Sequence, residues 1–280
     1  MRTEILAATL LTILPLDGSA ESPAAPAMAT VATTSEPPAL KFALQRGFHV
    51  VKSFTAVSGL TGWVMQAADG QYSVLFSTPD GQTLIDGSLV TSSGENLTQD
   101  YIAQYIPKPD LAVLWAKFEK SSFVIGGTQS NPTAVIYVIM DPNCIFCHML
   151  WIALKPYEAA GLQVRWIPVG FLHEDSAGKA AALLKGGEAV LTRMQEQFDE
   201  QAESAGIAGI EISPDLKVRL DANRALMRES QTYGTPGIFY KDTTGHVRRN
   251  DGMPKLSELS SITRIPAQTE SDPRLARFSN

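Results

Sequence analysis

The chain has 280 residues, of which 44% are hydrophobic and 19% are charged, and this composition excludes a disordered or collagen-like protein. The length predicts one or two domains. The 23 lysines and arginines against 29 aspartates and glutamates give a net charge of −6 without any basic run, so we expect no nucleic-acid partner.

The N-terminus has the pattern of a secretory signal peptide. An apolar stretch over 5–16 follows Arg2 and is too short to cross a bilayer, which takes about 20 helical residues. Small residues at 18–20 then provide a cleavage site, so we expect a signal peptide over 1–20 that is cleaved near Ala20. A buried N-terminal helix is the alternative. Export would place the cysteines in an oxidising compartment, where disulfide chemistry is at home.

A tether and a small β-rich domain are expected next. Residues 21–39 are rich in Ala, Pro, Ser and Thr and lack aromatic residues, which is typical of a flexible tether. Residues 40–106 contain short alternating strands separated by turns such as Asp69-Gly70, and they predict a small antiparallel-sheet domain. An exposed edge strand can pair with a second chain, so we expect self-association here; a monomeric module with a covered edge remains the alternative.

A helix is expected to join this domain to the next one. Pro107 and Pro109 end the β-rich segment, and Asp110 can cap a helix. Apolar residues with helical spacing follow at Leu111, Leu114, Trp115 and Phe118. We therefore expect a linker helix within 107–127, acting as a semi-rigid spacer.

From residue 128 to 265 the pattern changes to alternating strands and helices. Residues 133–140 read as a strand buried on both faces, and the helix and strand that follow up to residue 169 complete a βαβ unit. Residues 176–229 are mainly helical, and two short strands and a last helix come after them. The polar residues 266–280 predict a loose tail, and a short terminal helix is the alternative.

Both cysteines of the chain lie in one motif, Cys144-Ile145-Phe146-Cys147, where the buried strand ends and a helix begins. The free N–H groups and the dipole of a helix N-terminus favour a thiolate, which is the reactive form of cysteine. We therefore expect Cys144 to be a nucleophile and Cys147, one turn further, to attack a mixed disulfide formed at Cys144. A purely structural bridge is the alternative.

The same residues allow a second interpretation. Together with His148 they match the attachment pattern of c-type haem, in which both sulfurs form thioethers and the histidine binds iron. A structural zinc site needs about four ligands and is poorly supported by two cysteines and four histidines, so we expect no metal. The haem interpretation stays open at this point.

A second motif, Thr235-Pro236, lies between two glycines and before a short strand. A cis peptide bond is plausible there, and the backbone of Thr235 would be free to bind an extended peptide. A trans proline that starts an edge strand is the alternative. Among the aromatic residues near the cysteines, we expect Phe146 to be exposed.

Four segments carry a resemblance to a known family: TPDGQTLIDG at 78–87, GENLT at 94–98, VIYVIMDPNCIFC at 135–147 and YGTPGIFY at 233–240. The chain resembles the thioredoxin superfamily, and within it the exported disulfide isomerases of the DsbC/DsbG type, the DsbG branch most of all. The resemblance implies an α+β fold with a cystatin-like N-terminal dimerisation domain, a linker helix and a thioredoxin-like catalytic domain with a helical insertion. It also implies a V-shaped homodimer.

The resemblance implies a periplasmic enzyme that reduces or reshuffles non-native disulfides, or cysteine sulfenic acids, in exported proteins. Cys144 would attack, Cys147 would resolve, and Thr235, a cis Pro236 and Phe146 would contact the client. The only redox group would be the Cys144–Cys147 disulfide, without another cofactor, and a membrane reductase of the DsbD type would reduce it. DsbG-like sites usually have Pro-Tyr between the cysteines, where this chain has Ile145-Phe146, so Ile145 is expected to change the redox potential. His148 follows the second cysteine, as in many DsbC-like sites, and is expected to tune the potential as well.

Three other functions remain open on the sequence. A chaperone-like dimer could bind unfolded chains and use the redox site only secondarily. A c-type electron carrier would follow from the haem interpretation, and a monomeric oxidase would use the same two thiols.

Overall fold

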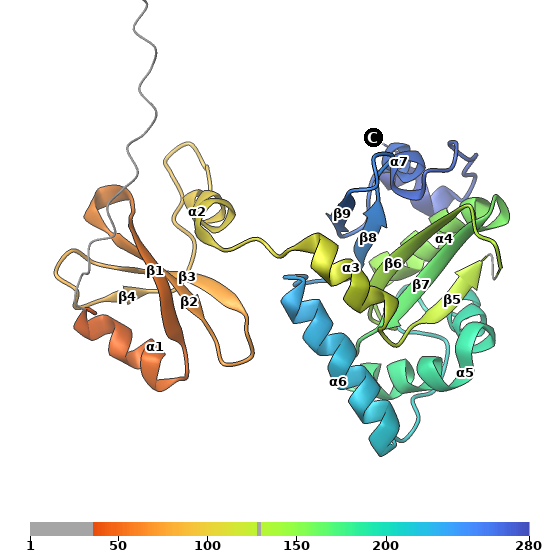
Figure 1. Ribbon diagram of the computed structural model, residues 1–280, viewed down its shortest axis with the longest axis horizontal. Helices are drawn as coiled ribbons and strands as arrows, with labels where there is room; N and C mark the ends of the chain where they lie inside the picture. The colour runs from red at the N-terminus through yellow and green to blue at the C-terminus, as the bar shows by residue number, and fades with distance from the viewer. Residues whose placement is uncertain (1–35, 128–129, 280) are drawn as a thin grey trace, which may run out of the picture. The chain divides into compact units, whose positions relative to one another are not determined.

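The computed structural model describes residues 36–127 and 130–279 (Figure 1). The signal peptide expected over 1–20 lies outside these residues, as does nearly all of the tether expected over 21–39. Within the described part, no helix combines the length and the apolar character that a membrane span needs.

The first sheet is antiparallel, with the strand order β1-β2-β3-β4. Its strands are β1 (His49–Thr55), β2 (Thr61–Gln66), β3 (Tyr72–Ser77) and β4 (Leu84–Ile85). Helix α1 (Lys41–Gln45), which follows the 3-10 turn η1 (Pro38–Leu40), belongs to this part, as do η2 (Val57–Gly59) and α2 (Leu97–Tyr105). The β-rich pattern of this segment is therefore confirmed.

Alternation along β2 gives the first sheet two apolar faces. Trp63 and Met65 pack with Leu40 and Ala43 next to α1, whereas Val64 packs on the other face, where α2 contributes Tyr101 and Tyr105. Successive side chains of a strand point to opposite faces, so one short strand serves both clusters.

The second sheet has the strand order β5-β7-β6-β8-β9. Its strands are β5 (Val124–Gly127), β6 (Ala134–Met140), β7 (Leu162–Pro168), β8 (Gly237–Lys241) and β9 (Val247–Asp251). Strands β6 and β7 are parallel and are joined by α4 (Ile145–Ala159), which confirms the expected βαβ unit; the remaining neighbours are antiparallel.

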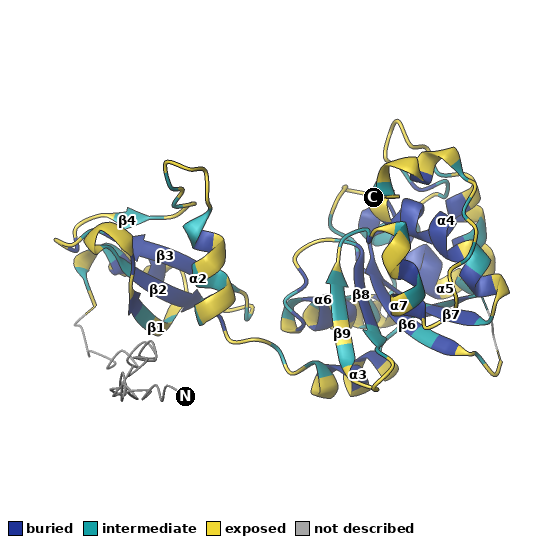
Figure 2. Ribbon diagram, turned by 90° about the horizontal axis from the view of Figure 1, so that it is seen from above, coloured by how far each residue is buried: buried dark blue, intermediate teal, exposed yellow. Residues whose placement is uncertain are grey.

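Helices cover both faces of this sheet (Figure 1). Ile136, Val138 and Met140 of β6 belong to the cluster that contains α4 and α7 (Leu259–Thr263), and Tyr137 and Ile139 belong to the cluster of the opposite face. Figure 2 shows the central strands and α4 largely buried. As the continuous apolar run predicted, β6 is buried on both sides.

The helical insertion consists of α5 (Ser176–Glu196) and α6 (Pro214–Glu229). Gly187 interrupts α5 with a φ of 64°, a backbone conformation that glycine adopts without steric cost. The chain then continues through the 3-10 turn η3 (Leu256–Glu258) into α7, and a last 3-10 turn, η4 (Pro273–Phe278), follows near the C-terminus.

The helix expected after Asp110 is present with that residue as its N-cap, but the segment 107–127 is not one linker helix throughout. Helix α3 spans only Leu111–Glu119, and its Leu114, Trp115 and Phe118 pack on the second sheet, where they contact core residues such as Phe239. Residues 124–127 form strand β5 rather than helix. An amphipathic stripe shows that one helix face is buried but not what covers it, and four residues are too few to show a strand period.

Over 266–280 the structure favours the alternative, a short terminal helix, over the loose tail. Pro273–Phe278 forms the turn η4, and Leu275 within it is fully buried in the cluster that contains α4. A single apolar anchor among polar residues produces no periodic pattern, so the sequence offers no signal of this packing.

Candidate active site

The two cysteines lie at the first turn of α4. Cys144 is the N-cap residue of the helix, and its Sγ accepts a hydrogen bond from the backbone N–H of Cys147 at 3.4 Å. Both cysteines are free thiols. An acceptor at this position binds a helix N–H that would otherwise be unpaired and lies at the positive end of the helix dipole.

The two thiols differ sharply in acidity. The pKa of Cys144 is lowered to about 7, mainly because the Cys147 side chain donates a hydrogen bond to its sulfur, and this effect exceeds the opposing effect of burial. The pKa of Cys147 is raised well above its ordinary value, mainly by burial. At neutral pH roughly half of the Cys144 population is therefore thiolate while Cys147 keeps its proton.

The two thiols also differ in access. Cys147 is fully buried, whereas Cys144, itself only 5% exposed, lines a hollow of about 530 Å³ on the surface. Phe146 and Leu172 line the same hollow and are 45% and 44% exposed, as expected for Phe146. The hollow thus places an apolar surface beside one of the two sulfurs.

The loop that contains Thr235 faces Cys144. The Thr235–Pro236 peptide bond is cis, as expected, and the carbonyl of Thr235 accepts a hydrogen bond from the Cys144 thiol at 3.2 Å. The structure therefore brings the two motifs together, because β6 and β8 are antiparallel neighbours and the end of β6 lies beside the start of β8.

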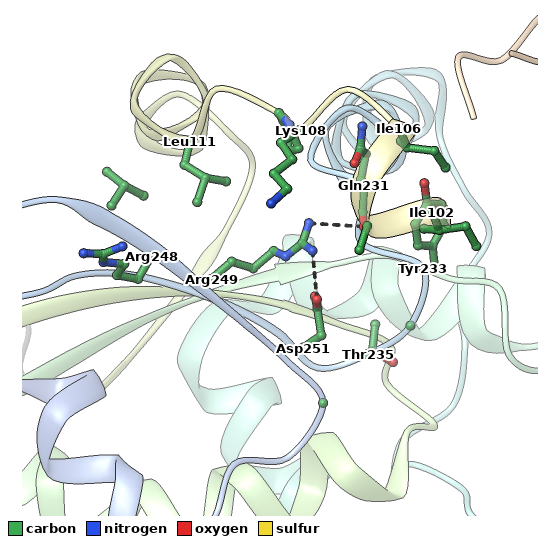
Figure 3. Close-up of a pocket in the computed structure, with 15 residues that line it drawn as sticks. Ile102, Ile106, Lys108, Leu111, Gln231, Tyr233, Thr235, Arg248, Arg249 and Asp251 are labelled. Atoms are coloured by element: carbon green, nitrogen blue, oxygen red, sulfur yellow. Dashed lines mark hydrogen bonds and ion pairs between the residues drawn. The ribbon is translucent and has the colours of Figure 1, made fainter. Parts of the chain in front are cut away.

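Arg249 of β9 holds this loop through hydrogen bonds and an ion pair (Figure 3). Its guanidinium donates to the carbonyls of Ser230 and Gln231, at 2.7 and 3.3 Å, and forms an ion pair with Asp251 at 3.0 Å. Charge-assisted bonds of this kind are among the stronger ones in proteins. They connect the residues that precede Thr235 to the edge strand β9.

A buried carboxylate holds the turn before Cys144. Asp141, at the end of β6, accepts four hydrogen bonds: from the backbone N–H groups of Asn143, Phe171 and Leu172 and from the hydroxyl of Ser176. These bonds tie the turn to the loop after β7 and to the first turn of α5.

Asn143, which precedes the nucleophile, is fully paired as well. Its oxygen accepts from Lys179 Nζ at 3.0 Å and from the backbone N–H of Ala205 at 2.9 Å, and its Nδ2 donates to Asp175 and Ser176. The sequence reasoning missed this network. The Asp-Pro-Asn turn beside Cys144 was a usable signal, but Lys179 is distant in sequence and no motif marks it.

His148 lies away from the hollow. It is buried, its Nδ1 is 2.8 Å from Gln195 Oε1, and its ring stacks on Phe198. Burial lowers the pKa of this imidazole, so it is neutral at pH 7. Ile145 lies partly buried at the hollow, beside Cys144.

The haem interpretation does not fit this geometry. Thioether formation would require both sulfurs at the edge of a haem pocket, but Cys147 and His148 are enclosed by side chains of α4, α5 and the sheet. Among the residues that the structure describes, no group of three or more His, Cys, Asp or Glu side chains could hold a metal ion.

Comparison with known proteins gives full-length relatives. No family model matches the chain. The thiol:disulfide interchange protein DsbG of Pseudomonas aeruginosa is 30% identical over 242 residues, which are 84% of this chain and 91% of the relative. DsbG of Escherichia coli is 27% identical over 83% of this chain and 93% of its own length. A solved structure of Helicobacter pylori DsbG is 16% identical, with a TM-score of 0.35, over 72% of this chain and 97% of that one.

Proposed function

The chain belongs to the DsbG family of thiol:disulfide interchange proteins, and on that basis we propose that Cys144 attacks client disulfides and that Cys147 resolves the resulting adduct. The thioredoxin-like α+β fold places the dithiol at a helix N-terminus, as this chemistry requires. The observation that carries the proposal is the asymmetry of the two thiols: one is acidic and lines a hollow, and the other is fully buried and protonated.

The exchange begins with the Cys144 thiolate. Its Sγ attacks one sulfur of a client disulfide, a new S–S bond forms, and the client's second sulfur leaves as a thiolate with the electron pair of the broken bond. In isomerisation, that client thiolate attacks another disulfide of the client, and a later client thiolate displaces Cys144. In reduction, the Cys147 sulfur attacks Cys144 Sγ and the bond between Cys144 and the client breaks. The client sulfur leaves with the electron pair of that bond and takes up the proton of Cys147, so the client is reduced and a Cys144–Cys147 disulfide remains.

A cysteine sulfenic acid would react by the same route. The Cys144 thiolate attacks the sulfenic sulfur, the S–O bond breaks with loss of hydroxide, and the mixed disulfide is resolved by Cys147. Both reductions leave the enzyme oxidised by two electrons. A dithiol reductant must restore it, and we propose a membrane reductase of the DsbD type. Clients and reductant share one compartment in this scheme, the periplasm, which agrees with the signal peptide expected from the sequence.

Serine variants of the two cysteines test these roles. We expect Cys144→Ser to abolish the reshuffling of a scrambled disulfide substrate, because no thiolate remains at the hollow. We expect Cys147→Ser to accumulate client adducts that resist alkylation and are released by dithiothreitol, because the resolving thiol is missing. A Cys144→Ser protein that still reshuffled the substrate would contradict the proposal. Suppression of client aggregation that persisted in the double variant would favour the chaperone alternative.

We also propose that two chains pair through the first sheet. Strand β1 is an edge strand of that sheet and most of its residues are exposed or half-buried, so its outer backbone groups can bond to a second chain. Static light scattering on residues 21–280 is expected to give twice the mass of one chain. A mass equal to one chain would contradict this part of the proposal and favour the monomeric oxidase.

A further inference from the structure

The C-terminal turn η4 is fixed beside the active-site helix. Leu275 is fully buried in the same apolar cluster as residues of α4. Arg274 forms ion pairs with Asp272 at the start of the turn and with Glu200, the latter at 2.8 Å. A buried apolar anchor and a bridging arginine hold this segment to the catalytic part of the chain.

The end of the turn forms one wall of the hollow at Cys144. Arg277 lines that hollow together with Cys144 and Phe146. The ring of Phe278 meets the ring of Phe146 edge to face, with centroids 6.4 Å apart. The guanidinium of Arg277 lies 4.8 Å from the centroid of Phe278 and 5.8 Å from that of Phe146. The exposed Phe146 between the cysteines therefore contacts the C-terminal turn, and that turn contributes Arg277 to the lining of the hollow.

Arg277 contacts aromatic rings but has no carboxylate partner among the described residues. Arg274 makes the ion pairs of this segment, and none made by Arg277 is found among the described residues. Stacking on an aromatic ring holds a guanidinium in place and leaves its N–H edge free, which suits bidentate binding of a carboxylate. The guanidinium is thus oriented at the hollow and available to a ligand.

Two carboxylates line the same hollow, but they do not neutralise Arg277. Glu200 is already paired with Arg274, and Glu203 is exposed in the loop that follows. Among the described residues that line the hollow, one cationic group, Arg277, and one anionic group, Glu203, have no ion-pair partner. A client segment in the hollow therefore meets one charge of each sign beside the reacting sulfur.

We propose that Arg277 is a specificity-determining residue that selects client segments with an Asp or Glu close to the cysteine under attack. The inference rests on the proposed function and names the class of substrate for that site. An extended segment advances about 3.3 Å per residue, and a hollow of about 530 Å³ admits only a few residues, so the carboxylate would lie close in sequence to the client cysteine. The contact is exposed to solvent, so it sets a preference among clients rather than an absolute requirement.

Mixed disulfides of short synthetic peptides with the uncharged leaving group thiopyridine test this preference. Attack by Cys144 at the peptide sulfur forms a peptide–Cys144 disulfide and releases thiopyridone, whose absorbance gives the rate constant. The peptides differ at one position only, two residues before or two residues after the cysteine. That position is occupied by Asp, Asn or Lys. We expect the wild-type protein to react about two- to fivefold faster with the better-placed Asp peptide than with its Asn counterpart, the difference shrinking at high salt.

Variants of Arg277 test whether this side chain causes the preference for the Asp peptide. Arg277→Gln should bring the ratio of the Asp and Asn rate constants to about one, whatever its effect on the Asn rate itself, and Arg277→Glu should invert the preference towards Lys. Arg264→Gln, an exposed arginine that does not line this hollow, is the matched control and should retain it. Equal rates for the Asp and Lys peptides, or a preference unchanged in Arg277→Gln, would overturn the inference and leave the interchange chemistry standing. A wild-type protein that attacked none of the peptides would overturn the proposed function as well.

Discussion

Replacing Lys179 tests whether the buried network behind Cys144 stabilises the fold. The Lys179 ammonium group is almost fully buried and contacts Asn143 Oδ1 at 3.0 Å, Ser204 Oγ at 2.8 Å and Asp175 Oδ2 at 2.8 Å. Methionine keeps most of the apolar stem and removes the charge. Hydrogen bonds to charged groups contribute about 1.5–3 kcal/mol each, but the variant no longer has to bury an ammonium group, which offsets several kcal/mol.

The loss is further limited because Asn143 keeps its bond from Ala205, and the Asp175 side chain is 52% exposed and can be rehydrated. We therefore expect Lys179→Met to lower the free energy of unfolding by about 2 kcal/mol. The chain offers a matched control in Lys217, which pairs with Asp221 at the same i,i+4 spacing and at 2.7 Å but with a side chain that is 68% exposed. Lys217→Met should cost at most about 0.5 kcal/mol.

Urea unfolding of the reduced protein, followed by tryptophan fluorescence and circular dichroism, measures both variants. The reasoning requires the transition of Lys179→Met to shift clearly to lower urea and that of Lys217→Met to stay near the wild type. Equal shifts for the two variants would refute it, because burial would then make no difference to the value of the contact.

Two further predictions concern the first sheet and the pH dependence of stability. A Cβ added at Gly62 would lie 2.1–2.6 Å from atoms of the Phe54 ring, so Gly62→Ala should lower the free energy of unfolding in urea by about 1–3 kcal/mol. The control is Gly234→Ala, which should be tolerated because no atom lies within 4 Å of the added Cβ. Equal effects of the two substitutions would contradict this prediction. The pKa of Cys144 lies at about 7 in the folded state, below its ordinary value of 9.0. Its ionisation therefore stabilises the reduced protein progressively from pH 7 to 9, by up to about 2–3 kcal/mol. This contribution is lost as the pH falls through 7. The raised pKa of Cys147 lowers the stability above pH 9, in the opposite direction. Cys144→Ser should lack the rise in the free energy of unfolding between pH 7 and 9. Parallel pH profiles of stability for the wild type and Cys144→Ser would count against the lowered pKa of Cys144.

The parts of the site that sequence reasoning identified are those with a local signature. The strand–helix junction at Cys144 follows from an apolar run that ends in a turn, and Thr235-Pro236 is marked by the glycines around it. That these motifs meet depends on the antiparallel pairing of β6 with β8, which local patterns do not specify. The resemblance to the DsbC/DsbG type supplied that link.

The parts that sequence reasoning missed depend on packing between distant segments. Lys179 looks like any lysine of a helix, and only the approach of α5 to the turn before Cys144 makes it a buried partner of Asn143. Leu275 is one apolar residue in a polar tail, and its burial depends on the surface offered by α4. Helix α3 shows a correct apolar stripe, but the sequence does not say that this stripe covers the second sheet.

The rate at which iodoacetamide alkylates the reduced protein, measured against pH, tests the central claim most directly. Thiolate is the species that reacts, and Cys147 is shielded by burial, so the initial rate reports on Cys144. We expect the rate to be half-maximal at about pH 7, with peptide mapping placing the label on Cys144. A midpoint near the ordinary value of 9.0, or a label found mainly on Cys147, would contradict the account.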